Sequence, residues 1–305
     1  MDDPQIEIAY ATNEEYLPVL GTSLHSLIEH TSMAHRYRIS ILMEEIATEQ
    51  QERILNMQTK NVSIRFVDVH PWTKEYQIPT VGHLSQETAY RLVLDQIFRE
   101  QEKVVYIDAD TLIFHDVAEL FSVDIGEHVL GAVLGRLMSD FLPYVRDVLK
   151  FPLEDYFNAG ILVINLPKFR RLNIGKRALS MLHSPKYLTR DQDVLNILCH
   201  HDVQYLDGRW NVEQQPLCFP EETPFIDAGR EGSLAYLEAP FILHYASPRK
   251  PWNVPEYPKA DLWWREARHA GFAHDVAAWM RKKEVAPISS HRNVMAAEAL
   301  VTKRG

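Results

Sequence analysis

The sequence predicts an α/β fold with a mostly parallel sheet and helices on both of its faces. Short β-branched apolar runs alternate with longer segments of helical period up to residue 107. This alternation is typical of parallel sheets, because the helices that connect parallel strands cover both faces. The chain has 305 residues, 46% of them apolar, which is enough to bury a large core.

Four apolar runs in the first part of the chain are expected to be strands. They are IEIAYA at 6–11, YRISILM at 37–43, VSIRFVDV at 62–69 and VVYI at 104–107. Helical periodicity between these runs predicts helices over 15–30, 48–60 and 86–100. In a Rossmann-like sheet of this kind, ligands bind beyond the carboxyl ends of the strands.

The second half of the chain is less regular. Its elements are expected to be strands at 128–134, 157–166, 203–206 and 241–245, a helix at 168–183, and loops at 215–225 and 247–258. We interpret residues 1–260 as one α/β domain and residues 261–305 as a helical, partly basic C-terminal extension.

Composition excludes several classes of protein. The net charge of -10 argues against nucleic acid as a partner. Only Cys199 and Cys218 are present, which is too few for a disulfide framework or a thiolate zinc site and favours a reducing cytoplasm. The N-terminus lacks the pattern of a signal peptide, and no apolar run is long enough to span a membrane.

Two aspartates follow the strand expected at 104–107. In an extended chain Asp108 and Asp110 would project from the same side, about 6.6 Å apart. Carboxylates that share a cation must place their oxygens about 2.0 to 2.6 Å from it, so the chain is expected to turn at Ala109. The triplet alone is weak evidence, because the chain has another at 191–193 and a solvated strand end is the plainer interpretation.

A different metal enzyme also begins with this pattern. The run resembles the haloacid-dehalogenase-like phosphotransferases, in which the first aspartate is the nucleophile. There a threonine stands two residues after the second aspartate, whereas here Thr111 follows Asp110 directly. The aspartates also come after three strand-helix units instead of at the first strand, so a phosphotransferase is the less favoured hypothesis.

The segment 241–253, FILHYASPRKPWN, adds an imidazole and cations. A histidine that leaves an apolar strand is more often a structural residue than a ligand. Lys250, six residues after His244, makes the segment suited to an anionic diphosphate whose other oxygens are held by a metal. Two carboxylates and an imidazole favour manganese more than an all-oxygen site would.

Six motifs between Ala9 and Trp252 carry a resemblance to a known family. They are AYATNEEY from Ala9, TAYRL from Thr88, VYIDAD from Val105, YFNAGILVINL from Tyr156, DQDVLN from Asp191 and HYASPRKPW from His244. The sequence resembles the retaining glycosyltransferases of family 8, especially the bacterial lipopolysaccharide galactosyl- and glucosyltransferases. The resemblance implies a GT-A fold and manganese, with magnesium as the alternative ion. It also implies transfer from UDP-glucose or UDP-galactose to a glycan or other hydroxyl acceptor with retention at the anomeric carbon.

The resemblance also implies roles for individual residues. Asp108, Asp110 and His244 would hold the metal, and Asp191 and Gln192 would lie by the anomeric carbon as the catalytic pair. The residues implied to bind the donor are Ala9, Ala11, Thr12, Asn13, Arg91, Asp108, Ala109, Asp110, Asn158 and Lys250. A front-side substitution and a short-lived covalent intermediate both stay open, since Asp191 is a fair nucleophile and Gln192 a poor one. The plainer interpretations are a surface arginine for Arg91 and a first-turn helix carboxylate for Asp191.

The chain departs from the family pattern at two places. Members commonly carry an aspartate that meets the uracil ring, whereas this chain has Ala11, Thr12 and Asn13, so backbone groups, Thr12 or Asn13 are expected to contact the base. Related galactosyltransferases carry an acidic residue after the strand expected at 128–134, where this chain has Gly135 and then Arg136. The choice between glucose and galactose therefore stays open.

The acceptor and the class of protein each leave alternatives. The acceptor would be set by 137–155 and 213–223, and lipopolysaccharide core, a protein glycan and a small polyol all fit. A non-catalytic scaffold that binds sugar nucleotides is the alternative to an enzyme, although all three expected metal ligands are present. The tail at 277–305 has an excess of basic residues, which fits either weak peripheral contact with an anionic inner-membrane surface or a solubilising or oligomer-packing tail.

Overall fold

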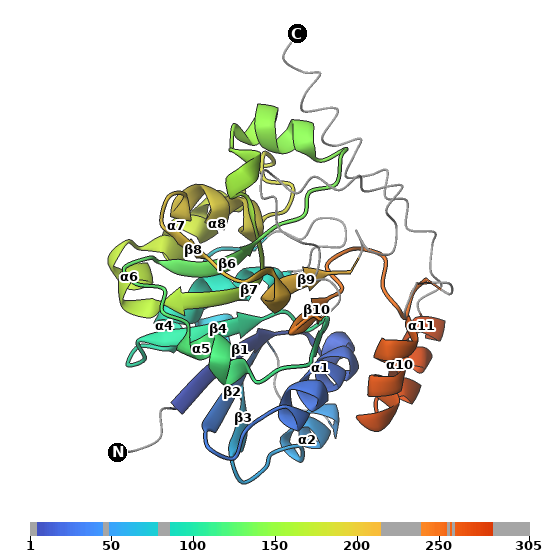
Figure 1. Cartoon of the computed structure of the whole chain (residues 1–305). Helices are drawn as coiled ribbons and strands as arrows, with labels where there is room; N and C mark the ends of the chain where they lie inside the picture. The colour runs from blue at the N-terminus through green and yellow to red at the C-terminus, as the bar shows by residue number, and fades with distance from the viewer. Residues whose placement is uncertain are drawn as a thin grey trace.

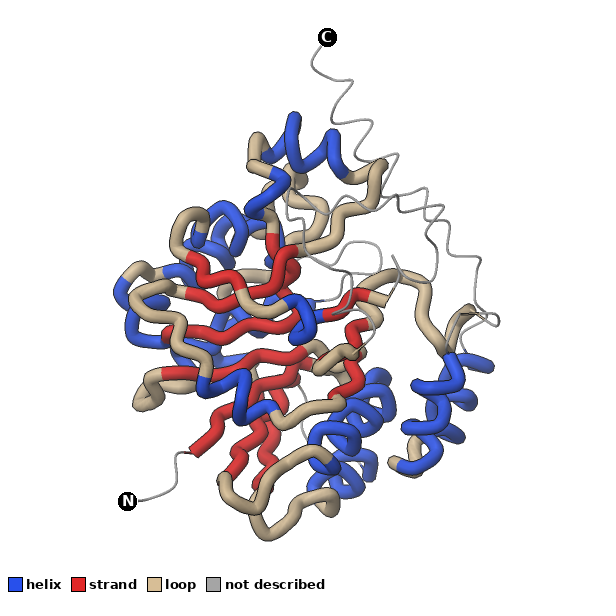
Figure 2. The backbone as a smooth tube through the Cα atoms, viewed as in Figure 1, coloured by secondary structure: helices blue, strands red, loops and turns tan. Residues whose placement is uncertain are grey.

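A seven-stranded sheet runs through the centre of the protein (Figures 1 and 2). The structure is a computed structural model that describes residues 5–44, 49–78, 86–214, 239–254, 257 and 260–282. The strands lie in the order β3 (Val62–Asp68), β2 (Arg36–Met43), β1 (Gln5–Ala11), β4 (Lys103–Ile107), β7 (Phe157–Asn165), β6 (Leu130–Leu134) and β8 (Val203–Tyr205). All neighbouring pairs are parallel except those of β7, which runs antiparallel to β4 and β6. The predicted mostly parallel sheet is confirmed.

Helices cover both faces of this sheet because successive strand residues point to opposite sides. Ile8 packs in a core with α1 (Leu17–Glu29), α2 (Glu49–Leu55) and α5 (Val117–Ser122). Its neighbour Ala9 packs in a second core on the other face. The helices that contribute buried residues there are the 3-10 helix Gln86–Val93, α4 (Leu94–Ile97), α6 (Leu166–Arg171), α7 (Ile174–Met181) and α8 (Asp191–Cys199), while α3 (His70–Thr73) lies at its margin.

A second, three-stranded sheet lies beyond the carboxyl end of β4. Its strand order is β5 (Thr111–Ile113), β10 (Ile242–His244) and β9 (Val212–Glu213), with β10 antiparallel to β5. His244 is therefore paired with Thr111, directly after the turn that carries the two aspartates. The expected strand at 241–245 is confirmed, whereas β5 and β9 are too short to be predicted from their sequence pattern.

The C-terminal extension begins with two helices that pack on α1 (Figure 1). The buried side chains of Trp263 on α10 (Ala260–His269) and Val276 on α11 (Ala273–Lys282) share an apolar cluster with Val19 of α1. His25 and Glu266 add a contact of 2.6 Å between α1 and α10. The boundary between the two predicted domains stays a prediction.

Three predicted helices differ from those in the structure. The helix expected at 168–183 is divided into α6 and α7, because Asn173 between them has a left-handed φ of 54° that no continuous helix accommodates. The helix expected at 86–100 is a 3-10 helix followed by the short α4, so it ends before Phe98. The helix expected at 48–60 is α2, which ends at Leu55, whereas the helix expected at 15–30 matches the 3-10 turn Glu14–Tyr16 followed by α1.

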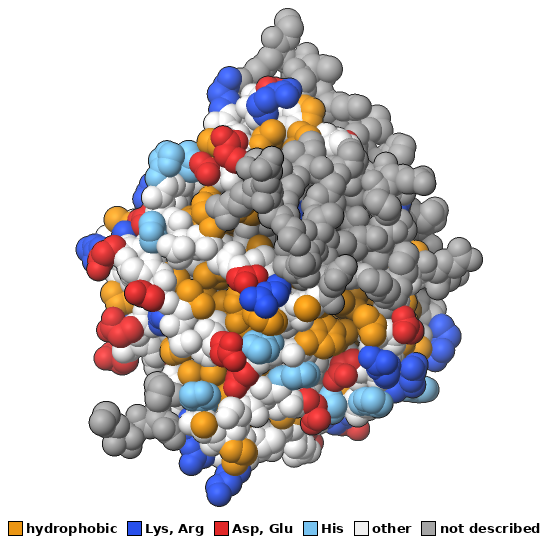
Figure 3. Space-filling model, in the orientation of Figure 1, with side chains coloured by type: hydrophobic (Ala, Val, Ile, Leu, Met, Phe, Trp, Pro, Cys, Tyr) orange, Lys and Arg blue, Asp and Glu red, His pale blue; other side chains and the backbone are white. Residues whose placement is uncertain are grey.

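Parts of several predictions lie outside the described residues. They are the loop at 215–225, most of the second acceptor segment, and the tail from 283 onward with the membrane contact proposed for it; residues 255, 256 and 258 of the loop expected at 247–258 also lie outside. Within the described part of the chain, no helix combines the length and the apolar character that crossing a membrane requires. The face of the molecule in Figure 3 carries basic and acidic side chains in small separate groups. Exclusion of nucleic acid stays a prediction from net charge.

Candidate metal site at the edge of the sheet

Three predicted metal ligands meet where β4 ends. His244 Nε2 lies 3.3 Å from Asp110 Oδ1 and 3.6 Å from Asp108 Oδ2, and one ligand atom from each residue lies within 4.8 Å of the others. The chain turns at Ala109, as predicted, and the Thr111 hydroxyl closes the turn by donating to the Asp108 carbonyl at 2.9 Å. The turn and the pairing of β10 with β5 therefore bring together residues that are more than 130 positions apart.

Gly160 on β7 provides the space in which these ligands lie. Its carbonyl accepts a hydrogen bond of 2.8 Å from the Asp108 amide, so the backbone of β7 directly adjoins the site. A Cβ at this position would lie 2.2 Å from His244 Cε1 and 2.8 Å from Asp108 Oδ2, which is closer than real Cβ contacts. Any side chain at residue 160 would therefore displace a ligand.

A hydrogen-bond chain orients His244 toward the carboxylates. The Gly160 amide donates to Asn158 Oδ1 at 2.8 Å, and Asn211 Nδ2 donates to the same oxygen at 2.9 Å. Asn211 Oδ1 is thereby left to accept from His244 Nδ1, at 2.9 Å. With the proton on Nδ1, the Nε2 lone pair faces Asp108 and Asp110, which is the arrangement that a metal-ligating histidine requires.

This donor set fits a divalent metal ion. Two carboxylates and one imidazole converge with separations suited to a shared cation, and the imidazole is held by a partner behind it. Burial raises the pKa of Asp110, but the Lys250 ammonium and His244 lower it by more, so the carboxyl stays ionised. Lys250 contacts the Asp110 carboxylate and the Tyr245 carbonyl, which places its charge beside the proposed metal position.

Arg91 is buried beneath the site, with 4% of its surface exposed. Its guanidinium lies 2.8 Å from Asp108 Oδ1 and 3.0 Å from Asp191 Oδ2, and it also donates to the carbonyls of Thr88 and Ala159. The Tyr106 ring packs at 4.4 Å from the guanidinium carbon, and its hydroxyl donates to Asp108 at 2.8 Å. Arg91 is therefore not a surface arginine, since it joins the metal ligands to the predicted catalytic pair.

Asp191 and Gln192 begin α8 and face β7. The Asp191 carboxylate is buried, and this burial raises its pKa to about 6 even though Arg91 lowers it. Gln192 Oε1 accepts from the Ala159 amide at 3.0 Å, and its Nε2 donates to the Tyr156 hydroxyl at 3.2 Å. Both groups are thus held in place next to the strand that carries Asn158 and Gly160.

The second aspartate of the 191–193 triplet is structural. Asp193 is fully buried and accepts hydrogen bonds of 2.6 Å from the hydroxyls of Tyr144 and Tyr156 and of 2.8 Å from the Thr189 amide. Burial raises the pKa of Asp193, and these hydrogen bonds lower it by less. The prediction that this triplet is not a second metal site fits its geometry, because Asp193 points away from Asp191 into the tyrosine pair.

We expect Asp193→Asn to lower the free energy of unfolding by about 2–4 kcal/mol. The asparagine NH2 would replace one carboxylate oxygen and oppose one or two of the three groups that donate to Asp193, and buried donors left without acceptors cost about 1–3 kcal/mol each. Urea denaturation measures the change. Tyr156→Phe removes only one of the bonds and should cost less, whereas equal midpoints for wild type and Asp193→Asn would contradict the prediction.

The end of β1 supplies the remaining predicted residues. Ala9 pairs with Tyr106 of β4, so Ala11, Thr12 and Asn13 follow at the edge that carries Asp108. The Thr12 amide donates to the Leu42 carbonyl at 3.0 Å, and Asn13 caps the helical turn Glu14–Tyr16. These residues therefore lie at the predicted edge, while their contacts with a donor remain a proposal.

Four residues that support the site were not assigned a role from the sequence. They are Tyr16, Tyr106, Gly160 and Asn211. Burial raises the pKa of Tyr16, and the nearby charges of Asp110 and Asp108 raise it further. Three of the four lie inside motifs that carry the family resemblance, whereas Asn211 has no signal in its sequence context.

The chain is similar in sequence and in fold to several known proteins. The chain is 24% identical over 258 residues to General stress protein A of Bacillus subtilis, covering 82% of this chain and 88% of that protein. It is 24% identical over 312 residues to a lipopolysaccharide 1,3-galactosyltransferase of Salmonella typhimurium, covering 99% of this chain and 88% of that protein. The galactosyltransferase LgtC, solved with donor and acceptor sugar analogues, superposes with a TM-score of 0.71 at 26% identity over 87% of this chain and 96% of that one.

A larger protein contains the same fold. The bifunctional glycosyltransferase WbbM superposes with a TM-score of 0.75 at 25% identity, covering 92% of this chain and 52% of that one, so the present chain spans about half of WbbM. The fold is therefore GT-A, as the resemblance implied. The sequence profile of glycosyl transferase family 8 matches residues 7–255, and the chain belongs to this family.

Proposed function

We propose that this family 8 glycosyltransferase moves glucose or galactose from a UDP-sugar to a hydroxyl acceptor, with retention at the anomeric carbon. The observation that carries the proposal is the convergence of Asp108, Asp110 and His244 next to a buried carboxylate, Asp191, with Arg91 bridging the two groups. A metal-diphosphate and the sugar attached to it need these two centres side by side. The similarity to a lipopolysaccharide galactosyltransferase supports a glycan acceptor.

Different residues are proposed to act on the departing UDP and on the sugar. A divalent metal held by Asp108, Asp110 and His244 would supply Lewis-acid stabilisation of negative charge on the departing UDP. Lys250 already lies beside Asp110 and needs only to turn its ammonium toward a bound diphosphate. We propose manganese in preference to magnesium, because an imidazole ligand suits the later divalent metals.

Asp191 and Gln192 are proposed to lie against the donor sugar. The Asp191 carboxylate can stabilise positive charge that develops at the anomeric carbon or attack that carbon, and its pairing with Arg91 weakens it as a nucleophile. Gln192 holds the backbone of β7 through Ala159, so it positions Asp191 relative to Asn158. The front-side and two-step pathways both remain compatible with this arrangement.

Hydrolysis of UDP-sugars tests the function without knowledge of the acceptor. We expect release of UDP from UDP-glucose or UDP-galactose, but much less from UDP-N-acetylglucosamine or UDP-glucuronic acid, when manganese is present. Excess EDTA should abolish the release, and added manganese should restore it. Full activity in EDTA would contradict the proposed metal role, and binding of UDP-sugar without any turnover would favour a non-catalytic scaffold. A phosphorylated Asp108 would favour the phosphotransferase.

The raised pKa of Asp191 predicts an acid limit to activity. A carboxyl with a pKa of about 6 becomes protonated below that pH and loses the charge proposed to act at the anomeric carbon. We expect kcat/KM to fall about tenfold per pH unit below this value. Manganese affinity measured over the same pH range is the control, since weaker metal binding would give a similar fall. A constant kcat/KM down to pH 5 with metal bound would contradict the prediction.

The acceptor is proposed to bind over the segment 137–155. Its buried side chains Tyr144, Val145, Leu149 and Phe151 form a separate apolar cluster with Tyr156. The Tyr144 hydroxyl donates to Asp193 and also lies 2.8 Å from the Lys186 carbonyl, which ties the segment to the start of α8. The segment is therefore fixed next to the proposed catalytic pair, where an acceptor hydroxyl must reach.

A further inference from the structure

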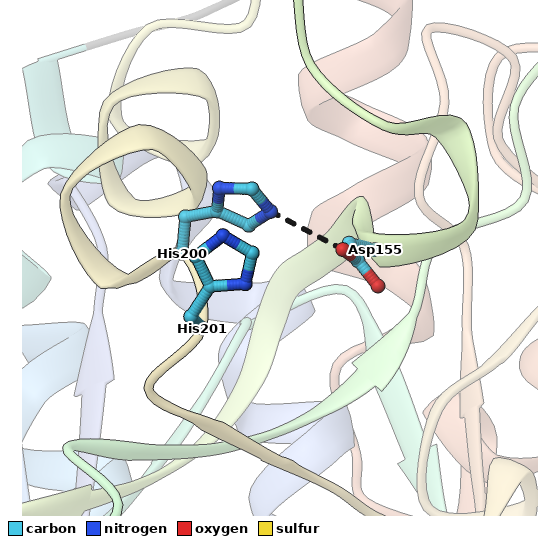
Figure 4. A group of neighbouring side chains, drawn as sticks. All are labelled: Asp155, His200 and His201. Atoms are coloured by element: carbon cyan, nitrogen blue, oxygen red, sulfur yellow. Dashed lines mark hydrogen bonds and ion pairs between the residues drawn. The ribbon is translucent and has the colours of Figure 1, made fainter.

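A second group of metal-ligating side chains lies at the opposite end of α8. His200 and His201 follow the last residue of this helix, and Asp155 ends the 3-10 turn Leu153–Asp155 that precedes β7. His200 Nε2 lies 3.2 Å from Asp155 Oδ2, and one ligand atom from each of the three lies within 4.8 Å of the others. Figure 4 shows both imidazole rings on the side of the helix end that faces Asp155.

The distance between His200 and Asp155 fits a tetrahedral ion. Ligands at about 2.0–2.2 Å from a tetrahedral zinc are about 3.3 Å from one another, close to the observed distance between His200 and Asp155. His201 is exposed, so its ring can turn to complete the set without disturbing the core. Two imidazoles and a carboxylate leave a fourth position for water and favour zinc over magnesium or calcium.

The surrounding contacts hold the His200 ring and the backbone of the Asp155 turn, while the His201 ring can turn. His201 has a left-handed φ of 66°, which brings its ring to a centroid distance of 3.6 Å from the ring of His200. The Phe151 ring packs at 4.5 Å from the ring of His200. Tyr205 donates to the Asp155 carbonyl at 2.8 Å, which fixes the backbone of the turn. The ligands thus come from two segments that neighbouring residues anchor independently.

We propose that Asp155, His200 and His201 form a structural site for zinc or a similar late transition-metal ion, separate from the metal site at the sheet edge. The nine residues of α8, a helix about 13 Å long, separate this site from Asp191, which Arg91 links to the metal site at the sheet edge. An ion here would join the end of α8 to the turn that leads into β7. Because α8 begins with Asp191 and β7 carries Asn158, the ion would hold together the two elements that deliver the proposed sugar site.

Zinc stoichiometry tests the site. The full chain without a histidine tag is titrated with zinc against a chromogenic chelator, and we expect two equivalents for wild type. Asp110→Asn, which damages the first site, should leave one tight equivalent, and X-ray absorption of this equivalent should show two imidazole ligands. Adding His201→Gln to Asp110→Asn should lower the affinity for the remaining zinc ion more than about tenfold, because even outer-shell changes weaken metal affinity about 10- to 100-fold.

The controls separate this site from ordinary surface histidines. His201 is exposed, so His201→Gln should leave the thermal midpoint without zinc unchanged, while the rise in midpoint caused by zinc should disappear. His269→Gln removes an exposed histidine from α10 and should change neither measurement. Retention of the tight equivalent in the combined Asp110→Asn and His201→Gln variant would overturn the proposal. So would an equal loss in His269→Gln, or the absence of any tight equivalent in Asp110→Asn.

Discussion

Replacing Asp110 with asparagine is expected to lower turnover by about three powers of ten or more. Asp110 Oδ1 faces His244 Nε2 at 3.3 Å, and its other oxygen holds Lys250, so one carboxylate serves both the proposed metal and the cation next to it. Losing a charged ligand weakens stabilisation of the leaving group by a few kcal/mol, and each 1.4 kcal/mol is about tenfold in rate. The measurement is UDP release at saturating manganese.

The matching readout is manganese affinity by electron paramagnetic resonance. Asp110→Asn should weaken it about 10- to 100-fold or more, since changes to outer-shell residues alone have effects of that size. Asp261→Asn removes an exposed carboxylate at the start of α10 and serves as the control for loss of one charge. Near wild-type turnover by Asp110→Asn at saturating manganese would show that Asp110 is not a ligand, whatever the effect on folding.

The central sheet could be predicted because each of its long strands carries its own signal. β1 and β2 are mostly apolar, as strands buried on both faces are expected to be, although Glu7 interrupts β1 and Arg38 and Ser40 interrupt β2, and their bounds differ from those expected by one residue. The break between α6 and α7 could not be predicted, because it depends on the left-handed backbone of Asn173 within a segment of unbroken helical period. β5 and β9 escaped prediction because their pairing with β10 defines them more than their composition does.

The two aspartate ligands could be predicted from the order of the elements, whereas the residues that support them could not. Asp108 and Asp110 end a strand at the edge where ligands bind, and this position follows from the order of the elements. Asn211 could not be found in the same way, because an asparagine becomes a histidine partner only when the fold places it there. The contact of Arg91 with the donor stays a prediction, and its ion pairs with Asp108 and Asp191 could not be predicted because they depend on the fold.

The metal ligands fit beside β7 only because Gly160 has no side chain. We expect Gly160→Ala to lower turnover by about 100-fold or more and to weaken manganese binding. The added Cβ would lie 2.2 Å from His244 Cε1 and 2.8 Å from Asp108 Oδ2, so a ligand has to move. His244 is 2% exposed and has little room to retreat, and a displacement of about 1 Å costs about 100-fold in rate.

A second glycine separates this effect from general overpacking. Gly131 lies on β6, away from the ligands, and its added Cβ would meet Ile125 Cγ2 at 2.9 Å. Both alanine variants should lose about 1–3 kcal/mol of unfolding free energy, since overpacking a buried position costs that much. Only Gly160→Ala should also lose manganese affinity, because only its Cβ meets metal ligands. If the two variants lose activity equally, the loss comes from overpacking of the sheet and not from displacement of His244 and Asp108.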